Sequence, residues 1–175
     1  MKVKLIRHTS VDVPKGVCYG QTDVPLKDTF PEEAAATRKR ITGEDLDRVF
    51  TSPLSRCTKL ADYCGYPDAI RDDRLKELNF GAWEMQWFDR ITDPRIQEWF
   101  DDFLNVPATG GESLMMQFQR VSSFLDEMKQ RNYKHIAVFA HGGVLACAQV
   151  YAGLLKPEDI FCSIPPYGAV VQIEV

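Results

Sequence analysis

Three short apolar segments occur in this chain, and a helix-forming sequence follows each of them. These segments span residues 3–6, 49–50 and 136–140 and have the length and composition of buried strands. Helices are predicted to start near Pro31, at Ser52-Pro53, and at Gly142. Strands that alternate with helices predict an α/β fold, here a three-layer α/β/α sandwich around a mostly parallel central sheet.

The remaining segments complete one predicted domain over residues 1–175. An aromatic-rich stretch at 75–105, broken by Pro94, predicts one or two short helices lying across the sheet edge, and residues 82–108 are expected to form a small helical cap. Residues 168–175 have the pattern of a final edge strand. A long amphipathic helix is predicted where apolar residues recur at helical spacing: Leu114, Phe118, Val121, Leu125 and Met128.

Composition limits the partners of the chain. A formal net charge of −4 on 175 residues argues against nucleic acid or an anionic membrane surface as a partner. A small anionic substrate is still compatible, because a few cations in a pocket can outweigh the average field. No apolar run is long enough to span a bilayer or to act as a signal peptide. We expect a cytoplasmic protein, monomeric or homodimeric, whose five scattered cysteines are reduced.

The three histidines of the chain fall at informative places. His8 and His141 each follow a predicted strand directly, so both are expected at the carboxyl rim of the sheet, where open α/β sheets bind ligands. Either one alone would more often be a structural histidine in a loop, but two on one rim favour a site. His135 precedes its strand and is predicted at the opposite rim, in a structural or solvent-facing role.

Two arginines and a pair of glycines accompany these histidines. Arg7 directly precedes His8, and Gly142-Gly143 directly follow His141, where glycines at a helix start let an anion approach the backbone N–H groups. Arg56 falls in the first turn of the helix that follows Ser52-Pro53. A cation is unfavourable there unless it faces a shared anion. The alternative for Arg56 is a solvated surface arginine.

This set of groups would bind a phosphoryl group, because planar guanidinium groups match phosphate oxygens bidentately. The sequence has no acidic cluster that predicts magnesium, and two histidines without a third ligand do not make a zinc site. Neither a metal nor a cofactor is therefore expected. Phosphoryl transfer would then need a protein nucleophile, which a neutral imidazole can supply when a hydrogen bond fixes its other nitrogen.

The order of five motifs resembles that of the histidine phosphatase superfamily, specifically its phosphoglycerate-mutase-like branch, over nearly the whole chain. These motifs are RHT at 7–9, SPLSR at 52–56, ELNFGAWE at 77–84, GES at 111–113 and HGG at 141–143. Within that branch, CYGQTDVPL at 18–26 and WEM at 83–85 look most like α-ribazole phosphatases of cobalamin synthesis.

The resemblance implies a metal-independent phosphomonoesterase that acts through a phosphohistidine intermediate. It implies that His8 is the nucleophile and that Arg7, Arg56 and His141 hold the phosphoryl oxygens. Glu77 would protonate the leaving oxygen and then deprotonate water, which requires a carboxyl pKa above its free value of about 4.3. Further substrate contacts are expected from residues that lie in or beside these motifs: Gly142, Tyr19, Gly20, Gln21, Phe80 and Trp83.

The chain departs from the family pattern in two places. Thr9-Ser10 replaces the usual Gly-Glu after the Arg-His pair, and the usual downstream Asn has no counterpart near Val13-Pro14. The chain also lacks the longer insertion that retains the intermediate in true mutases, which favours hydrolysis over return of the phosphoryl group.

Several substrates and one non-catalytic function are compatible with these motifs. The leading hypothesis is hydrolysis of α-ribazole 5′-phosphate, whose flat base could stack on aromatic residues between Phe80 and Phe103, although most of those residues are expected to be core. The alternatives are a broad-specificity phosphatase or mutase acting on sugar phosphates or phosphoglycerate, a phosphatase of phosphorylated proteins, and a protein that binds a phosphorylated ligand without turnover.

Overall fold

The computed structural model describes residues 1–43 and 45–175, in which five strands form one sheet. Strands β1 (Lys2–Arg7), β2 (Arg48–Thr51), β3 (Ile70–Arg71) and β4 (His135–Ala140) are parallel, whereas β5 (Val170–Glu174) pairs antiparallel with β1. The strand order is β3-β2-β4-β1-β5. The two strands that precede His8 and His141 are therefore neighbours in the middle of the sheet.

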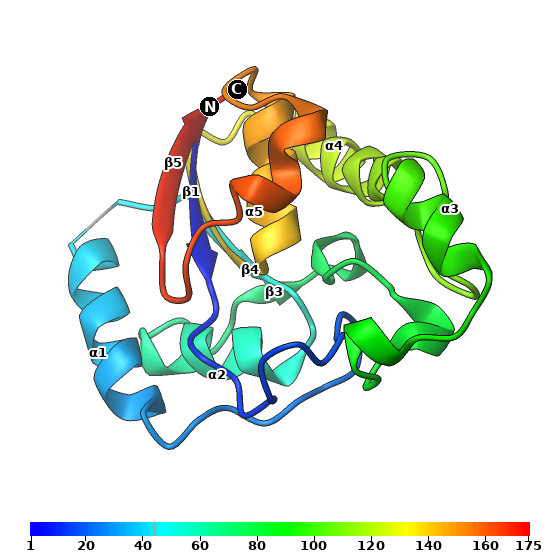
Figure 1. The fold of residues 1–175 in the computed structure, drawn as a ribbon. Coiled ribbons are helices and arrows are strands. Elements are labelled where there is room, and N and C mark those ends of the chain that lie inside the picture. The colour runs from blue at the N-terminus through cyan, green and yellow to red at the C-terminus, as the bar shows by residue number, and fades with distance from the viewer. Residues whose placement is uncertain (44) are drawn as a thin grey trace.

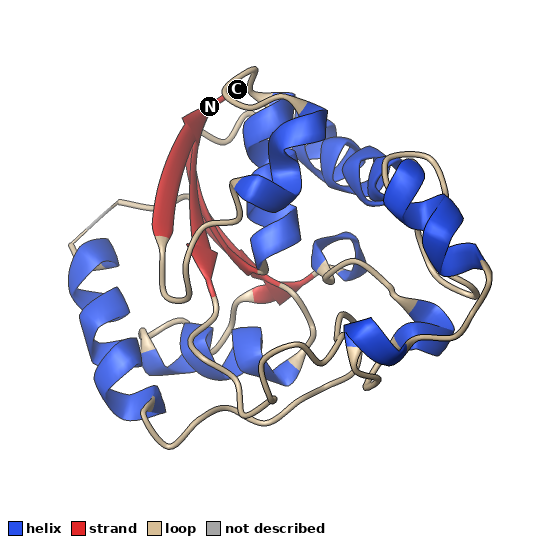
Figure 2. Ribbon diagram, viewed as in Figure 1, coloured by secondary structure: helices blue, strands red, loops and turns tan. Residues whose placement is uncertain are grey.

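Helices cover both faces of this sheet, as Figures 1 and 2 show. Helices α1 (Phe30–Ile41) and α2 (Ser55–Tyr63) lie on one face, and α4 (Leu114–Gln130) and α5 (Gly142–Tyr151) lie on the other. Alternate residues of β1 point to opposite sides, because Val3 and Leu5 pack with α4 and α5 while Ile6 packs with α1 and α2. The predicted three-layer sandwich is confirmed.

The two chain termini lie together at one end of the sheet, where the Val175 amide donates to the Met1 carbonyl at 2.9 Å (Figure 1). The carboxyl end of β1 points away from them, so His8 is at the rim opposite the termini. His135 is paired with Lys2 at the end near the termini, as predicted. None of the helices in the described ranges has both the length and the apolarity to traverse a bilayer.

The aromatic-rich stretch folds as short helical turns with a small hydrophobic core. Its elements are η1 (Asp73–Leu75), η2 (Gly81–Trp83), η3 (Phe88–Arg90) and α3 (Arg95–Asp101). The expected short helix is confirmed in α3, but α3 lies beyond α4 and not across the sheet edge (Figure 1). The core of this stretch consists of Cys18, Trp83, Ile91, Trp99 and Ala108.

Some element boundaries differ from those predicted. Helix α2 begins at Ser55 and not at Ser52-Pro53, and the Asp23 carboxylate accepts hydrogen bonds from both the Ser55 amide (2.9 Å) and its hydroxyl (2.8 Å). Helix α5 begins at Gly142, as predicted, and ends at Tyr151. The two-residue strand β3 and the 3₁₀ segment η4 (Pro157–Cys162) were not predicted.

Candidate active site

The two rim histidines lie side by side. Residues Arg7 of β1 and Ala140 of β4 are register partners, so the residues that follow them leave the sheet together. The His8 amide donates to the Ala140 carbonyl at 3.1 Å, and the centroids of the His8 and His141 rings are 5.2 Å apart. The parallel pairing of β1 and β4 thus brings together two side chains that are far apart in the sequence.

The His8 ring is buried, with 2% of its surface exposed, and its orientation is fixed by the backbone. Its Nδ1 lies 2.8 Å from the Thr9 carbonyl oxygen. A carbonyl oxygen can only accept, so Nδ1 carries the proton and Nε2 keeps a free lone pair. Burial, with further contributions from the positive charges of Arg56 and Arg7, lowers the His8 pKa to about 3. At neutral pH the ring is therefore an uncharged imidazole.

Both ring nitrogens of His141 have protein partners. Nδ1 accepts a hydrogen bond from Arg56 Nε at 3.2 Å, which leaves the ring proton on Nε2, 2.7 Å from the Ser52 hydroxyl. Burial and, next, the charge of Arg56 lower the pKa of His141 well below its ordinary value. His141 is therefore placed beside His8 as predicted, but its direct contact with a phosphoryl oxygen stays a prediction.

Arg56 is completely buried, so the alternative of a solvated arginine is wrong. Besides its bond to His141, it donates from Nη1 to the Thr22 carbonyl at 3.0 Å and from Nη2 to the Gly20 carbonyl at 2.5 Å. Of its five N–H donors, two have no partner among the described contacts, and these are available to an anion.

Arg7 lies between the last loop and the start of α5. Its Nη1 donates to the Pro165 carbonyl at 2.5 Å, and its Cζ is 4.1 Å from the centre of the Tyr167 ring. Its buried Nε has no hydrogen-bond partner among the residues that the structure describes. A Cβ at Gly142 would lie 3.1 Å from the Arg7 Cζ, so glycine there lets the guanidinium approach the N-terminus of α5.

Glu77 meets the same helix N-terminus. Its Oε2 accepts from the Gly143 amide at 3.1 Å, and its Oε1 accepts from the Leu78 amide and from Gln117 Nε2, both at 2.9 Å. A Cβ at Gly143 would overlap the Glu77 carboxylate. The second glycine of the HGG motif therefore makes room for a carboxylate from another part of the chain.

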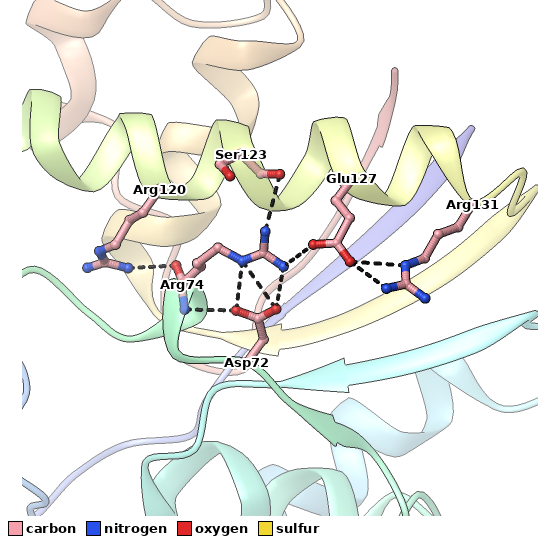
Figure 3. A network of polar contacts seen from close by, with 6 residues as sticks. All are labelled: Asp72, Arg74, Arg120, Ser123, Glu127 and Arg131. Carbon is pink, nitrogen blue, oxygen red and sulfur yellow. Dashed lines mark hydrogen bonds and ion pairs between the residues drawn. The ribbon is translucent and has the colours of Figure 1, made fainter.

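The segment that carries Glu77 is fastened to α4 by Arg120. This arginine donates from Nη1 to the carbonyls of Arg74 (2.7 Å) and Lys76 (2.6 Å) and from Nη2 to that of Glu77 (2.9 Å). Figure 3 shows the contact between Arg120 and Arg74 at the end of a chain of ion pairs along α4. In that chain the Arg74 guanidinium lies 2.7 Å from both Asp72 and Glu127.

A cavity of about 180 Å³ opens beside these groups. Two residues that the sequence singled out for substrate contact, Tyr19 and Phe80, are among its lining residues. Gln117, Phe161 and Ile164 also line it and were not predicted. The full lining consists of Arg7, Tyr19, Glu77, Leu78, Phe80, Gln117, Gly143, Phe161 and Ile164. Its walls are mainly apolar, and the polar groups of Arg7, Glu77 and Gln117 meet at the N-terminus of α5.

Among the residues predicted to touch substrate, Trp83 is contradicted by the structure, whereas substrate contact by Gly20 and Gln21 stays a prediction. Trp83 is a core residue, with 1% of its surface exposed and its indole N–H 2.8 Å from Asp93 Oδ2, so its ring cannot stack on a ligand. The Gly20 carbonyl accepts from Arg56, and the Gln21 side chain donates to the Glu77 carbonyl at 3.1 Å. Gly20 and Gln21 thus hold the arginine and the carboxylate segment in place.

Tyr167 is a site residue that the sequence did not indicate. Its ring lies against Arg7, its centroid is 5.5 Å from that of His8, and its hydroxyl is 2.6 Å from the Tyr19 hydroxyl. No local pattern marks a tyrosine in the loop before the last strand. Gln117 did have a signal, because it is a polar residue on the apolar side of α4, between Leu114 and Val121.

In the described part of the chain, no three His, Cys, Asp or Glu residues are close enough to hold a metal ion.

Comparison with known proteins places this geometry in context. The profile of the histidine phosphatase superfamily (branch 1) matches residues 3–175. Phosphoserine phosphatase 1 of Hydrogenobacter thermophilus is 25% identical over 97% of the chain and 86% of its own length. Probable phosphoglycerate mutase GpmB of Serratia proteamaculans is 29% identical, with 84% and 72% covered. The crystal structure of α-ribazole phosphatase from Shigella flexneri superposes with a TM-score of 0.89 at 23% identity, covering 100% of the chain and 91% of that structure.

Proposed function

Because the chain belongs to the histidine phosphatase superfamily and is a phosphatase, we propose that it hydrolyses small phosphomonoesters by transferring the phosphoryl group to His8 without a metal ion. The observation that carries this proposal is the state of His8: a neutral imidazole whose Nδ1 is held by the Thr9 carbonyl, so that Nε2 carries the unprotonated lone pair. An imidazole in that state is a nucleophile at neutral pH.

In the first step, the His8 Nε2 lone pair attacks phosphorus, a P–N bond forms, and the bond from phosphorus to the ester oxygen breaks. The partial positive charge of the α5 N-terminus and the full charges of the two arginines would stabilise the negative charge on the three equatorial oxygens. Arg7 Nε is suited to this role because it is buried and has no partner among the described residues. Glu77, next to the helix N-terminus, donates a proton to the leaving oxygen.

In the second step, water attacks phosphorus, the P–N bond breaks, and inorganic phosphate leaves. Glu77 now takes the proton from that water, so one carboxyl serves first as acid and then as base. His8 returns to its neutral form with the proton still on Nδ1, because the hydrogen bond to the Thr9 carbonyl is not broken in either step. His141, fixed by Arg56 and Ser52 next to His8, is proposed to hold a phosphoryl oxygen.

The finer proposal is that the substrate is α-ribazole 5′-phosphate, as in the nucleotide-loop branch of cobalamin synthesis. It is supported by the sequence motifs at 18–26 and 83–85 and by the apolar walls of the cavity, where Phe80 and Phe161 could contact a flat base. Similar proteins named for phosphoserine and phosphoglycerate make a broader phosphatase the alternative, and the structural likeness below 25% identity is a likeness of fold alone.

Turnover of p-nitrophenyl phosphate with excess EDTA tests the proposed chemistry. We expect full activity in EDTA, and a loss of turnover by at least about three orders of magnitude in His8→Ala, because this variant lacks the proposed nucleophile. His135→Ala is the matched control, since this histidine lies at the opposite rim of the sheet. Activity that vanishes with EDTA, or that survives in His8→Ala, would overturn the proposal.

A further inference from the structure

One side chain in the cavity has a hydrogen-bonding group that the fold leaves unused. Gln117 on α4 is completely buried, and its Nε2 donates to Glu77 Oε1 at 2.9 Å. Its Oε1 is also buried and has no hydrogen-bond partner among the residues that the structure describes. A buried acceptor without a donor is unfavourable, so a group that supplies a donor is expected to bind there.

The position of this acceptor relates it to the reaction. The Gln117 amide and the Glu77 carboxylate meet above Gly143, where a Cβ would lie 2.9 Å from Gln117 Oε1 and would overlap Glu77. In the proposed mechanism, Glu77 protonates the ester oxygen of the leaving group. A leaving group whose ester oxygen meets Glu77 would bring the atoms next to that oxygen close to Gln117 Oε1.

The rest of the cavity determines which leaving groups fit. Apart from the polar end, its walls are formed by Tyr19, Leu78, Phe80, Phe161 and Ile164. Among the lining residues that the structure describes, Arg7 is the only cation, and it is assigned to the phosphoryl group. A carboxylate on the leaving group would find no second cation there, so the cost of removing it from water would not be offset by an ion pair.

We propose that Gln117 is a specificity-determining residue whose Oε1 accepts a hydrogen bond from a hydroxyl or N–H of the leaving group. This role of Gln117 rests on the proposed function and assigns a substrate class to it. The class is phosphomonoesters of neutral alcohols that have a hydrogen-bond donor close to the ester oxygen. Esters whose leaving group bears a carboxylate, such as phosphoserine and phosphoglycerate, are poor substrates on this account.

The role of Oε1 is tested by comparing kcat/KM for 2-hydroxy-2-phenylethyl phosphate and 2-phenylethyl phosphate, which differ by one hydroxyl. We expect the hydroxylated ester to be preferred about ten-fold or more by the unmodified enzyme, because the other ester leaves the acceptor unpaired. In Gln117→Met the ratio of the two kcat/KM values should fall to about one. Loss of the bond to Glu77 slows both esters alike, so their ratio isolates the acceptor.

Gln119→Met is the matched control, because Gln119 is exposed on the same helix, and it should keep the ten-fold preference. Equal kcat/KM for the two esters with the unmodified enzyme, or an unchanged preference in Gln117→Met, would overturn the assignment. If Gln117→Met does not fold, the comparison with the unmodified enzyme still decides. Phosphorylation of His8 is measured separately, so failure of the proposed chemistry would be distinguishable.

The exclusion of carboxylates has its own matched pair. Glycerol 3-phosphate and 3-phosphoglycerate share the hydroxyl on the carbon next to the ester-bearing carbon. The first carries a hydroxymethyl group where the second carries a carboxylate. We expect kcat/KM to be at least about ten-fold higher for glycerol 3-phosphate. A rate for 3-phosphoglycerate equal to or above that of glycerol 3-phosphate would contradict the proposed class of leaving group.

Discussion

His8 is neutral because of where the chain places it. Its ring is buried beneath the loops at the sheet rim, and two guanidinium groups lie near enough to oppose protonation. The Thr9 carbonyl acts in the other direction but is outweighed, and it fixes the ring proton on Nδ1. Burial thus prepares the free Nε2 for attack, and the same arginines are positioned to bind the incoming dianion.

Arg56 gives the clearest residue-scale prediction. It bonds His141 and the carbonyls of Gly20 and Thr22 from three different nitrogens of one planar group, whereas a lysine ammonium has all its donors on a single nitrogen. We expect Arg56→Lys to lower kcat by about 100-fold and the free energy of unfolding by roughly 3 kcal/mol. Enzyme kinetics and urea unfolding measure both effects.

Arg38→Lys is the control for this substitution, because Arg38 is exposed on α1. It should stay within about 0.5 kcal/mol of the unmodified protein and keep full activity. An Arg56→Lys enzyme with near-normal kcat would show that the guanidinium geometry is not needed.

The sequence predicted single residues well where motifs mark them and poorly where packing decides. The sequence places His8, Arg7, Arg56 and His141 on one rim, and the family resemblance adds Glu77. The structure brings these five side chains together, while their catalytic roles stay predictions. Trp83 was misplaced because an aromatic residue near a motif can face a local core instead of a ligand, and here Asp93 satisfies its N–H. The placement of Tyr167 depends on the loop before β5, which has no periodic pattern.

At the level of elements, the site is assembled where α5 begins. Its two opening glycines admit Arg7 from one side and Glu77 from the other. Helix α4 contributes Gln117 to Glu77 and Arg120 to the backbone that carries it. The geometry of Glu77 therefore depends on α4, although the motif that contains Glu77 is some 40 residues away in the chain.

The hydrogen bonds from Arg120 to the segment that carries Glu77 predict that a change in α4 lowers activity. Arg120→Ala removes three hydrogen bonds to the carbonyls of residues 74, 76 and 77. We expect turnover to fall about ten-fold and the free energy of unfolding to fall by roughly 2–3 kcal/mol, because the carbonyls lose charged donors. Steady-state kinetics and urea unfolding provide the measurement.

Arg131→Ala provides the comparison, at the residue that directly follows the last residue of α4 (Figure 3). Arg131 forms an exposed pair with Glu127 at 2.6 Å, and such pairs contribute less than about 1 kcal/mol. If Arg120→Ala were as active as Arg131→Ala, the Arg120 hydrogen bonds would have no part in holding Glu77.

Element boundaries were predictable only where the signal is local. Pro31 near the start of α1 and the apolar stripe of α4 are local signals, and both helices appear where expected. The start of α2 was misjudged because Ser52 bonds His141 and the cap comes from Asp23, a residue in a distant loop. Strand β3 has two exposed residues and no buried face, so no hydrophobic pattern in the sequence indicates it.

For the whole molecule, the order of the strands decides which residues meet. β1 and β4 are adjacent although more than 120 residues separate them, and their carboxyl ends form one rim. The alternation of strands and helices predicted the class of fold and the common rim, but adjacency of the two strands follows from tertiary packing.

Burial of two neutral histidines predicts an acid-sensitive fold. Below pH 6.5, the ordinary value, the unfolded chain takes up a proton on His8, whereas the folded protein does not until about pH 3. The folded state is therefore progressively destabilised as the pH falls from 6.5 to 3, by about 1.4 kcal/mol per pH unit for this group. His141 acts in the same direction.

Urea unfolding at pH 7 and pH 5 of the unmodified protein and of His8→Gln measures this effect. Glutamine does not titrate, so the variant should lose about 2 kcal/mol less stability between the two pH values. Identical losses in the two proteins would mean that His8 is not held neutral by the fold.

The most direct test of the account is to locate the phosphate in enzyme that is quenched during turnover. Enzyme mixed rapidly with p-nitrophenyl phosphate, quenched in alkali and digested should carry one phosphate on the peptide that contains His8, and acid should release it. Phosphate bound to His141 or to a hydroxyl side chain, or full turnover with no labelled peptide at any quench time, would contradict transfer through His8.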